Sequence, residues 1–236
     1  MVTTKNLILS DPKSPFAEAF RALRTNLQFT SVDKKIKIIL ITSSLPNEGK
    51  STIVKNLAYS VALTGNKVIV IDGDLRNPTV HKTFNLPNSR GLTNLLVEEG
   101  DYEAYLNVDT SYENLHILTS GPIPPNPTEL LGSNKMKKLL NQIKENYDYV
   151  FIDTPPVVNV TDAVVLAPVV DGVILVIQAG KTEIEAVNRA KEILDSVKAN
   201  ILGVVLNRVK ESQRGYYYYY YYYGDYKKQD KKRRKR

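Results

Sequence analysis

Apolar residues recur along residues 36–206 in short continuous runs, separated by polar segments. The runs do not alternate with polar residues, which is typical of parallel strands covered on both faces. We expect strands at residues 36–42, 68–71, 115–118, 149–152, 173–177 and 201–206. Helical periodicity lies between most of these runs, notably at 134–146 and 183–197, and in a helix that ends at residue 63. Repeated strand–helix units predict an α/β fold with a doubly wound, mostly parallel sheet.

A helix is also expected ahead of the first strand, at residues 14–30. Ser14 suits the N-cap and Pro15 the first helical position. The apolar side chains of this segment share one helix face: Phe16, Phe20, Leu23 and Leu27. We predict one domain over residues 1–209 and a separate tail over 210–236, which has no packable pattern and is expected to be disordered.

Composition and charge narrow the classes of function. The 236 residues include no cysteine, so disulfides and thiolate metal sites are excluded, and the two histidines, His81 and His116, lie far apart in sequence. No apolar run approaches the roughly 18 residues of a membrane span. The net charge of +7 arises in residues 227–236, because the rest of the chain carries 24 basic and 24 acidic residues. We therefore expect no specific nucleic-acid partner and a soluble protein.

A phosphate-binding motif follows the first strand. In residues 43–52, Gly49, Lys50 and Ser51 match the end of a Walker A loop, with Ser44 where the first glycine usually stands. Backbone N–H groups of such a loop cradle phosphates together with the helix N-terminus. Lys50 is expected to reach the β- and γ-phosphates of ATP and Ser51 to bind Mg²⁺. The predicted ATP-binding residues of the loop are Asn47, Glu48, Gly49, Lys50, Ser51 and Thr52. Asn47 is expected to adopt a left-handed conformation, which asparagine tolerates.

Carboxylates end two other predicted strands. Asp153 follows the run 149–152, as in a Walker B motif, and Asp72 and Asp74 follow the run 68–71. Side chains at the carboxyl ends of parallel strands face the ligand crevice. Three carboxylates are more than Mg·ATP binding needs, so we assign one of them to the incoming hydroxyl. The alternative is that Asp72 and Asp74 both serve the metal only.

The predicted tail is rich in tyrosine hydroxyl groups, which could accept a phosphoryl group. Eight consecutive tyrosines precede Gly224-Asp225-Tyr226. Such a run does not suit a core strand, because alternate rings would face water. Beside a phosphate-binding loop it predicts autophosphorylation, at Tyr216, Tyr217, Tyr218, Tyr219, Tyr220, Tyr221, Tyr222, Tyr223 and Tyr226.

Together these segments resemble the bacterial tyrosine kinases, in the stand-alone cytoplasmic form that acts in capsule and exopolysaccharide biosynthesis. Their fold is that of P-loop NTPases of the deviant Walker, partitioning-ATPase-like type. Besides the tyrosine cluster, the resemblance covers Walker A (43–52), Walker A′ (68–76), Walker B (150–156), the stretch 121–131 and an E-x-x-R-x-x-R element at 18–24.

The resemblance implies roles for these residues. Lys50, Ser51 and Asp153 hold Mg·ATP, while Asp72 and Asp74 complete the metal site and position the tyrosine. Asp72 is the expected base for the tyrosine hydroxyl. Ser51, Asp72 and Asp153 are the expected metal ligands, and Asn207 stands where related ATPases bind adenine.

Assembly is implied in the same way. Glu18, Arg21 and Arg24 correspond to residues by which the kinases form homo-oligomeric rings; from spacing alone they would be a solvated intrahelical ion pair. The family further implies a membrane-bound activator of the polysaccharide co-polymerase type, a protein-tyrosine phosphatase, other protein substrates and recruitment to the inner face of the membrane.

Two other functions compete with the kinase. One is a regulatory partitioning-type ATPase or scaffold that hydrolyses ATP without modifying tyrosine; the other is a binding module whose tail is phosphorylated by another enzyme. Partitioning and septum-site ATPases carry a second lysine five residues before the P-loop lysine, where this chain has Leu45, and they lack a polytyrosine tail. Both departures favour the kinase.

Overall fold

A computed structural model describes residues 8, 11–30, 35–98, 100–109 and 111–209. The nine tail tyrosines predicted to be modified lie outside the described residues, as does the basic end. The described residues form a seven-stranded sheet in the order β3-β4-β2-β5-β1-β6-β7. The strands are β1 (Ile38–Ser43), β2 (Val68–Asp72), β3 (Asn107–Val108), β4 (Leu115–Leu118), β5 (Tyr149–Asp153), β6 (Gly172–Gln178) and β7 (Ile201–Asn207). All neighbours are parallel except β3, which runs antiparallel to β4 at one edge.

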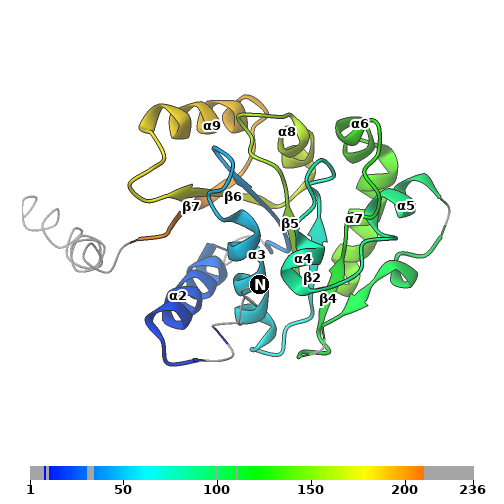
Figure 1. The fold of residues 1–236 in the computed structure, drawn as a ribbon, viewed down its shortest axis with the longest axis horizontal. Coiled ribbons are helices and arrows are strands. Elements are labelled where there is room, and N and C mark those ends of the chain that lie inside the picture. Colours follow the sequence, from blue (N-terminus) through cyan, green and yellow to red (C-terminus); the bar gives the residue numbers. More distant parts are fainter. Residues whose placement is uncertain (1–7, 9–10, 31–34, 99, 110, 210–236) are drawn as a thin grey trace, which may run out of the picture.

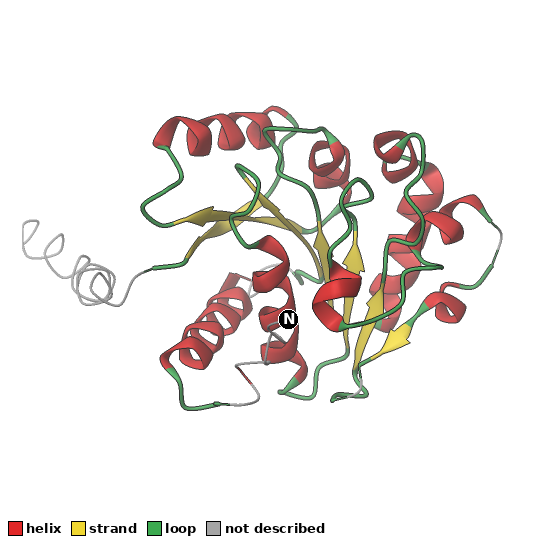
Figure 2. Cartoon of the chain, viewed as in Figure 1, coloured by secondary structure: helices red, strands yellow, loops and turns green. Residues whose placement is uncertain are grey.

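Helices cover both faces of this sheet (Figures 1 and 2). The longer ones are α2 (Pro15–Thr30), α3 (Lys50–Ala62), α7 (Asn134–Asn146) and α9 (Ile184–Ser196). Shorter ones are α4 (Val80–Phe84), α5 (Leu92–Val97), α6 (Pro127–Leu131) and α8 (Asp162–Leu166), with two 3₁₀ turns, η1 (Tyr102–Tyr105) and η2 (Ala167–Val169).

The core is divided by the sheet into two apolar clusters. Alternate residues of β1 point to opposite sides: Ile38 and Leu40 pack with α5, α7, α8 and α9, whereas Ile39 and Ile41 pack with α2, α3 and α4. All six residues of β1 are buried, as are all five of β2. Burial on both faces explains why these strands read as continuous apolar runs. The doubly wound architecture predicted from the sequence is confirmed.

The small elements were not anticipated in the sequence. The edge strand β3 has two residues, and α4, α5, α6 and α8 have five or six each. Segments this short carry less than two helical turns of periodic signal, so the hydrophobic pattern does not distinguish them from loops. They matter nonetheless, because α4, α6 and α8 lie in the chain directly after segments that end at the carboxyl edge of the sheet.

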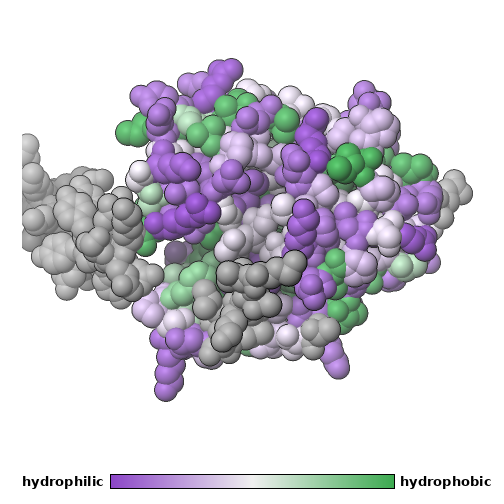
Figure 3. All heavy atoms as spheres, viewed as in Figure 1, coloured by the Kyte–Doolittle hydropathy of each residue, from purple (hydrophilic) through white to green (hydrophobic). Residues whose placement is uncertain are grey.

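On the face shown in Figure 3, hydrophobic and hydrophilic residues are interspersed. The large exposed apolar side chains come from different elements: Phe29, Leu63, Val97, Val108, Ile123, Ile184 and Val204. Single exposed apolar residues are ordinary on a protein surface. Within the described ranges, none of the helices has the length and apolar character needed to cross a bilayer.

Candidate active site

The phosphate-binding loop connects β1 to α3 at the carboxyl edge of the sheet. It leaves β1 after Ser43 and enters α3 at Lys50. Two residues adopt left-handed backbone conformations, Asn47 with φ 63° and Gly49 with φ 94°. The conformation predicted for Asn47 is therefore confirmed. The loop delivers the open N-terminus of a 13-residue helix, whose unpaired N–H groups favour an anion.

Gly49 is favoured by its positive φ, and its α-carbon lies close to the side chain of Asn207. A Cβ atom at this position would lie 2.2 Å from Nδ2 of Asn207. That amide nitrogen donates a hydrogen bond of 2.8 Å to the Glu48 carbonyl oxygen. The last strand, β7, thus ends against the phosphate-binding loop, as its parallel orientation predicted. Asn207, which the family resemblance places at the adenine, lies beside the phosphate-binding loop. Its contact with adenine stays a prediction.

The loop is braced from inside by the Glu48 side chain, which is 3% exposed. Its carboxylate accepts hydrogen bonds of 2.9 Å from Ser44 Oγ and from the Leu45 backbone N–H. The Thr182 hydroxyl, from the loop between β6 and α9, donates to the other carboxylate oxygen. The Glu48 side chain therefore supports the loop backbone, and Ser44 contributes a hydroxyl donor where a glycine has none.

Ser51 and Asp153 form the centre of the site. Ser51 Oγ donates a 2.5 Å hydrogen bond to Asp153 Oδ2, although the two residues are 102 positions apart. Asp153 is 1% exposed, and its other oxygen, Oδ1, is buried without a partner among the described residues. Burial raises the pKa of Asp153 to about 6, against the opposing effects of the Ser51 hydrogen bond and the Lys50 charge. The predicted Walker A and Walker B residues are thus brought together.

Asp72 and Asp74 lie beside this pair. Asp72 is opposite Asp153 in the register of β2 and β5, and it is completely buried. Its two oxygens accept backbone N–H groups, Oδ1 from Asp74 at 3.2 Å and Oδ2 from Val80 at 3.0 Å. Burial, followed by the charge of Asp153, raises the pKa of Asp72 well above its ordinary value.

Asp74 lies nearer the surface, at 9% exposure, and accepts the Asn77 N–H at 2.9 Å. Burial raises the pKa of Asp74, while hydrogen bonding from Asn77 and the charge of Lys50 oppose the shift. The three carboxylates predicted for the site are therefore adjacent. A cluster of buried acids with so little cationic compensation favours a bound cation.

The donors present fit a magnesium ion bound together with phosphates. Ser51 Oγ and the unpartnered Asp153 Oδ1 are hard oxygen ligands, and Mg²⁺ is usually held by one or two carboxylates plus substrate phosphates. Across the described part of the chain, no group of three or more His, Cys, Asp or Glu side chains is arranged to hold a metal by itself. The site therefore fits a metal that arrives with a nucleotide.

Two side-chain clusters at this edge were missed by sequence reasoning. Thr79 Oγ1 lies 2.7 Å from Ser51 Oγ. Arg76, the last residue of the Walker A′ segment, pairs with Asp162 at 2.7 Å and donates to Thr128 Oγ1 at 2.9 Å. Asp162 is fully buried. These bonds join the loop after β2 to α6 and α8. Arg76 and Thr128 lie in segments that carry the family resemblance, but Asp162 and Thr79 gave no sequence signal.

The three residues predicted to mediate oligomerisation lie on α2. Glu18 and Arg21 form an exposed pair with an N–O distance of 2.6 Å. Arg24 instead donates to the Ser60 carbonyl oxygen of α3 at 2.6 Å. Arg24 therefore fixes α2 on α3, while the first two residues remain at the surface.

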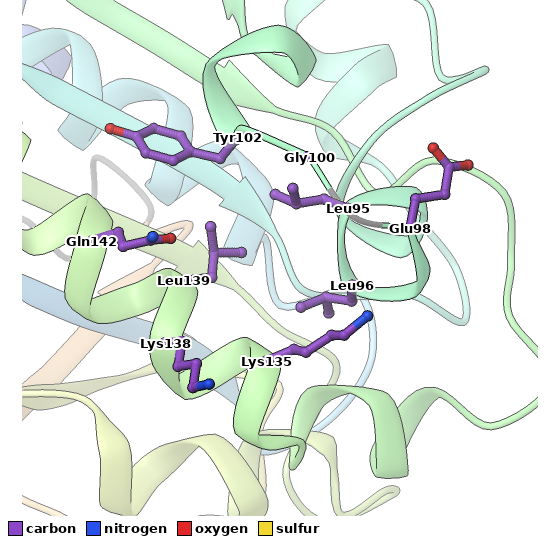
Figure 4. A pocket seen from close by; sticks show the side chains of 9 residues that line it. All are labelled: Leu95, Leu96, Glu98, Gly100, Tyr102, Lys135, Lys138, Leu139 and Gln142. Atoms are coloured by element: carbon purple, nitrogen blue, oxygen red, sulfur yellow. The ribbon is translucent and has the colours of Figure 1, made fainter.

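A shallow pocket of about 230 Å³ lies elsewhere, between α5, η1 and α7 (Figure 4). Its lining includes Leu96 and Leu139, with Lys135 and Lys138 on the α7 side. None of the predicted nucleotide-site residues lines it. The nucleotide site is consequently assigned from the loop and the buried carboxylates.

Comparison with known proteins places this arrangement in a family. Residues 36–205 match the family described as an AAA domain. The chain is similar to tyrosine-protein kinase YwqD of Bacillus subtilis (strain 168), with 46% identity over 216 residues that cover 90% of this chain and 91% of the relative.

Two solved structures separate the kinases from their fold relatives. The chimerical protein CapA2B2 superposes with a TM-score of 0.82 at 42% identity, covering 87% of this chain and 90% of that chain. The septum site-determining protein MinD of Pyrococcus horikoshii OT3, complexed with Mg-ADP, gives a TM-score of 0.62 at 25% identity, covering 76% of this chain and 73% of that one. The septum site-determining protein is therefore similar in fold at low identity, whereas the relatives named tyrosine-protein kinases match most of the chain in sequence. The chain therefore belongs to the family of bacterial tyrosine-protein kinases.

Proposed function

We propose that this kinase transfers the γ-phosphoryl group of Mg·ATP to tyrosines of its own C-terminal segment, Tyr216 to Tyr223 and Tyr226. The observation that carries the proposal is the group of buried acids around Ser51: Asp153 with an unpartnered oxygen, and Asp72 and Asp74 beside it. Nucleotide binding alone does not need three carboxylates, whereas phosphoryl transfer also needs the acceptor to be oriented.

Each residue has a distinct part in this reaction. Lys50, at the start of α3, binds the β- and γ-phosphates and neutralises charge that develops during transfer. Ser51 and Asp153 hold the metal, with Asp72 close by. Bound Mg²⁺ supplies charge neutralisation across the β- and γ-phosphates. Asn207, which ends β7 and bonds to the Glu48 carbonyl oxygen of the loop, is proposed to contact the adenine.

Asp72 is proposed to orient the tyrosine hydroxyl and accept its proton. A phenol has a pKa of about 10, so it enters the site protonated. A carboxylate whose pKa is raised by burial is a better proton acceptor near neutral pH than an exposed one. Since the transition state is loose, proton removal contributes less than positioning and charge neutralisation. The alternative, in which Asp72 and Asp74 serve only the metal, predicts equal losses of nucleotide affinity and of transfer in Asp72→Asn.

The acceptor tail begins close to the site of its own chain. β7 ends at Asn207 beside the phosphate-binding loop, and residues 209–226 span at most about 60 Å when extended. That reach covers either the same subunit's site or a neighbour's. We propose transfer to a neighbour, within a ring assembled through the surface residues Glu18 and Arg21 together with Arg24.

A mixing experiment tests both parts of the proposal. A full-length Lys50→Met chain is mixed with an active chain that lacks residues 215–236, in Mg·ATP with and without an activator's cytoplasmic peptide. Phosphotyrosine in the Lys50→Met tail, mapped by mass spectrometry, is the expected result. An unlabelled tail in the mixture, alongside a labelled tail in the intact active chain, refutes transfer between subunits. Inorganic phosphate without any phosphotyrosine refutes the autokinase and supports a regulatory ATPase.

The wider role follows from the family. We propose that the kinase regulates synthesis or export of a capsular or extracellular polysaccharide, as a cytoplasmic protein brought to the membrane by a membrane-bound activator. A phosphatase that resets the tail and further protein substrates belong to the same proposal. Co-purification with membranes that contain the activator, and loss of that association when the activator is deleted, is the expected result.

A further inference from the structure

The loop after β2 leads into α4, and its last residue, Thr79, contacts Ser51 of the proposed nucleotide site. Thr79 Oγ1 lies 2.7 Å from Ser51 Oγ, which in turn donates to Asp153 Oδ2. A hydroxyl group has one proton and two lone pairs. Because Ser51 gives its proton to Asp153, the hydrogen bond between the two hydroxyls must be donated by Thr79. One lone pair of Ser51 Oγ is then left for a cation.

The Thr79 side chain does not cap its own helix, although its position favours that role. It is the N-cap residue of α4, where a threonine side chain normally accepts a backbone N–H of the first turn, yet it makes no such bond. The N–H of Val80, the first residue of α4, is bound by Asp72 Oδ2 at 3.0 Å. The Thr79 hydroxyl contacts Ser51 in place of its own helix, and residues 72–80 connect the Walker A′ carboxylate with the Walker A hydroxyl.

Packing of α4 on α3 holds the threonine in this position. Ser51, Lys55 and Tyr59 are spaced four residues apart and share one flank of α3. Lys55 Nζ donates to the Thr83 carbonyl oxygen and lies 5.4 Å from the centre of the Phe84 ring. Tyr59 stacks on the same ring at 5.9 Å. The pair Thr79–Ser51 is the polar end of this helix contact.

We propose that Thr79 is a positioning residue of the kinase: its hydroxyl orients Ser51 Oγ so that a lone pair faces the metal of bound Mg·ATP. This inference rests on the proposed nucleotide site. It assigns to the segment after the Walker A′ motif a role in metal binding through Ser51, in addition to its carboxylates. Thr79 itself touches neither nucleotide nor acceptor in this assignment.

The test compares nucleotide affinity with and without metal. Thr79→Val removes the hydroxyl and keeps the branched shape, whereas Thr79→Ser keeps the hydroxyl and removes the methyl group. Binding of a fluorescent ADP analogue is titrated in Mg²⁺ and in EDTA. One hydrogen bond is lost, so we expect Thr79→Val to weaken Mg²⁺-dependent affinity about tenfold. Affinity in EDTA is expected to stay within about twofold of wild type, and Thr79→Ser to retain most of the magnesium effect.

A purely structural threonine gives a different pattern. Equal losses in magnesium and in EDTA, or wild-type magnesium dependence in Thr79→Val, overturn the proposal. Thr79→Ala replaces Thr79→Val in the same titration if the valine variant does not fold, as judged by thermal unfolding. The readout is independent of the phosphoryl acceptor. The two proposals can also fail separately. If the wild-type enzyme forms no phosphotyrosine, the autokinase is refuted. If Thr79→Val still weakens the magnesium-dependent binding of nucleotide, the present inference stands.

Discussion

Two aspartates next to β1, the partly buried Asp171 and the fully buried Asp153, lie in opposite electrostatic settings. Asp171, just before β6, accepts the N–H groups of Lys37 and Ile38 at 2.9 Å each and pairs with Lys144 at 2.5 Å. Burial alone raises the pKa of Asp171, but these donors outweigh it and leave the pKa lowered. Asp153, at the end of β5, has the Ser51 hydroxyl on one oxygen and no partner on the other within the described chain.

The difference separates a structural carboxylate from a functional one. At the amino edge of the sheet the charge of Asp171 is satisfied within the protein, so it contributes to folding. At the carboxyl edge Asp153 is left with a raised pKa, near two further acids, and this costs stability until a ligand arrives. A buried carboxylate with an unpartnered oxygen, next to two further buried acids, therefore indicates where the ligand binds.

The largest expected effect is on catalysis and compares two lysines. Lys50→Met removes the cation that acts on both Asp153 and Asp74 and the group proposed to bind the phosphates. We expect autophosphorylation to fall at least about 100-fold, measured as phosphotyrosine formed per minute. Lys144→Met is the matched control at the amino edge. It is expected to keep activity and to lose only about 1 kcal/mol of unfolding free energy, since the pair is partly exposed.

A smaller effect is expected on stability when Asp171 is changed. Both backbone N–H groups bind Oδ2 and Lys144 binds Oδ1, so in Asp171→Asn the amide oxygen can keep the two backbone bonds, now without charge, while the amide nitrogen faces Lys144. The unfolding free energy should fall by about 2 to 3 kcal/mol in denaturant titrations. Kinase activity well below the melting temperature should remain within about twofold of wild type. A stable but inactive Asp171→Asn protein would contradict the division between the two edges.

The opposite sign is expected for Asp153→Asn. The amide still accepts the Ser51 hydrogen bond and carries no buried charge, so the nucleotide-free protein should gain about 1 to 2 kcal/mol near pH 7.5. Phosphotyrosine formation should be lost in the same variant. Thermal unfolding of the nucleotide-free proteins measures the gain, and a lower melting temperature than wild type would show that the Asp153 charge is already compensated.

The pH dependence of stability sharpens the same contrast. The pKa of Asp153 rises from 3.8 to about 6 on folding, so the folded state binds the proton more tightly. Its contribution is present below about pH 4 and is lost as pH rises to about 6, by roughly 1 to 3 kcal/mol. Asp171 acts in the other direction, because a lowered pKa gives stability that is lost as pH falls. In Asp153→Asn the decline between pH 4 and 6 should become shallower.

The part of the site that could be read from the sequence consists of residues in local motifs. Gly49-Lys50-Ser51 must lie between a strand and a helix, and Asp72 and Asp153 end apolar runs. Since parallel strands end at the same edge, their proximity followed from the pattern. The contact of Thr79 with Ser51 and the contacts among Arg76, Asp162 and Thr128 could not be predicted from the sequence. Each of these contacts joins segments that are separated by 28 or more residues.

The sequence by itself therefore determined the class of fold, the phosphate-binding loop and the acids of the site, since these depend on short-range patterns of hydrophobicity and on spacing within motifs. The tertiary structure decided which of these groups are satisfied. Whether Asp153 keeps an oxygen free, and whether Thr79 caps its own helix or binds Ser51, depends on hydrogen bonds between distant segments. Such bonds form only after packing has buried the groups and removed water as the alternative partner.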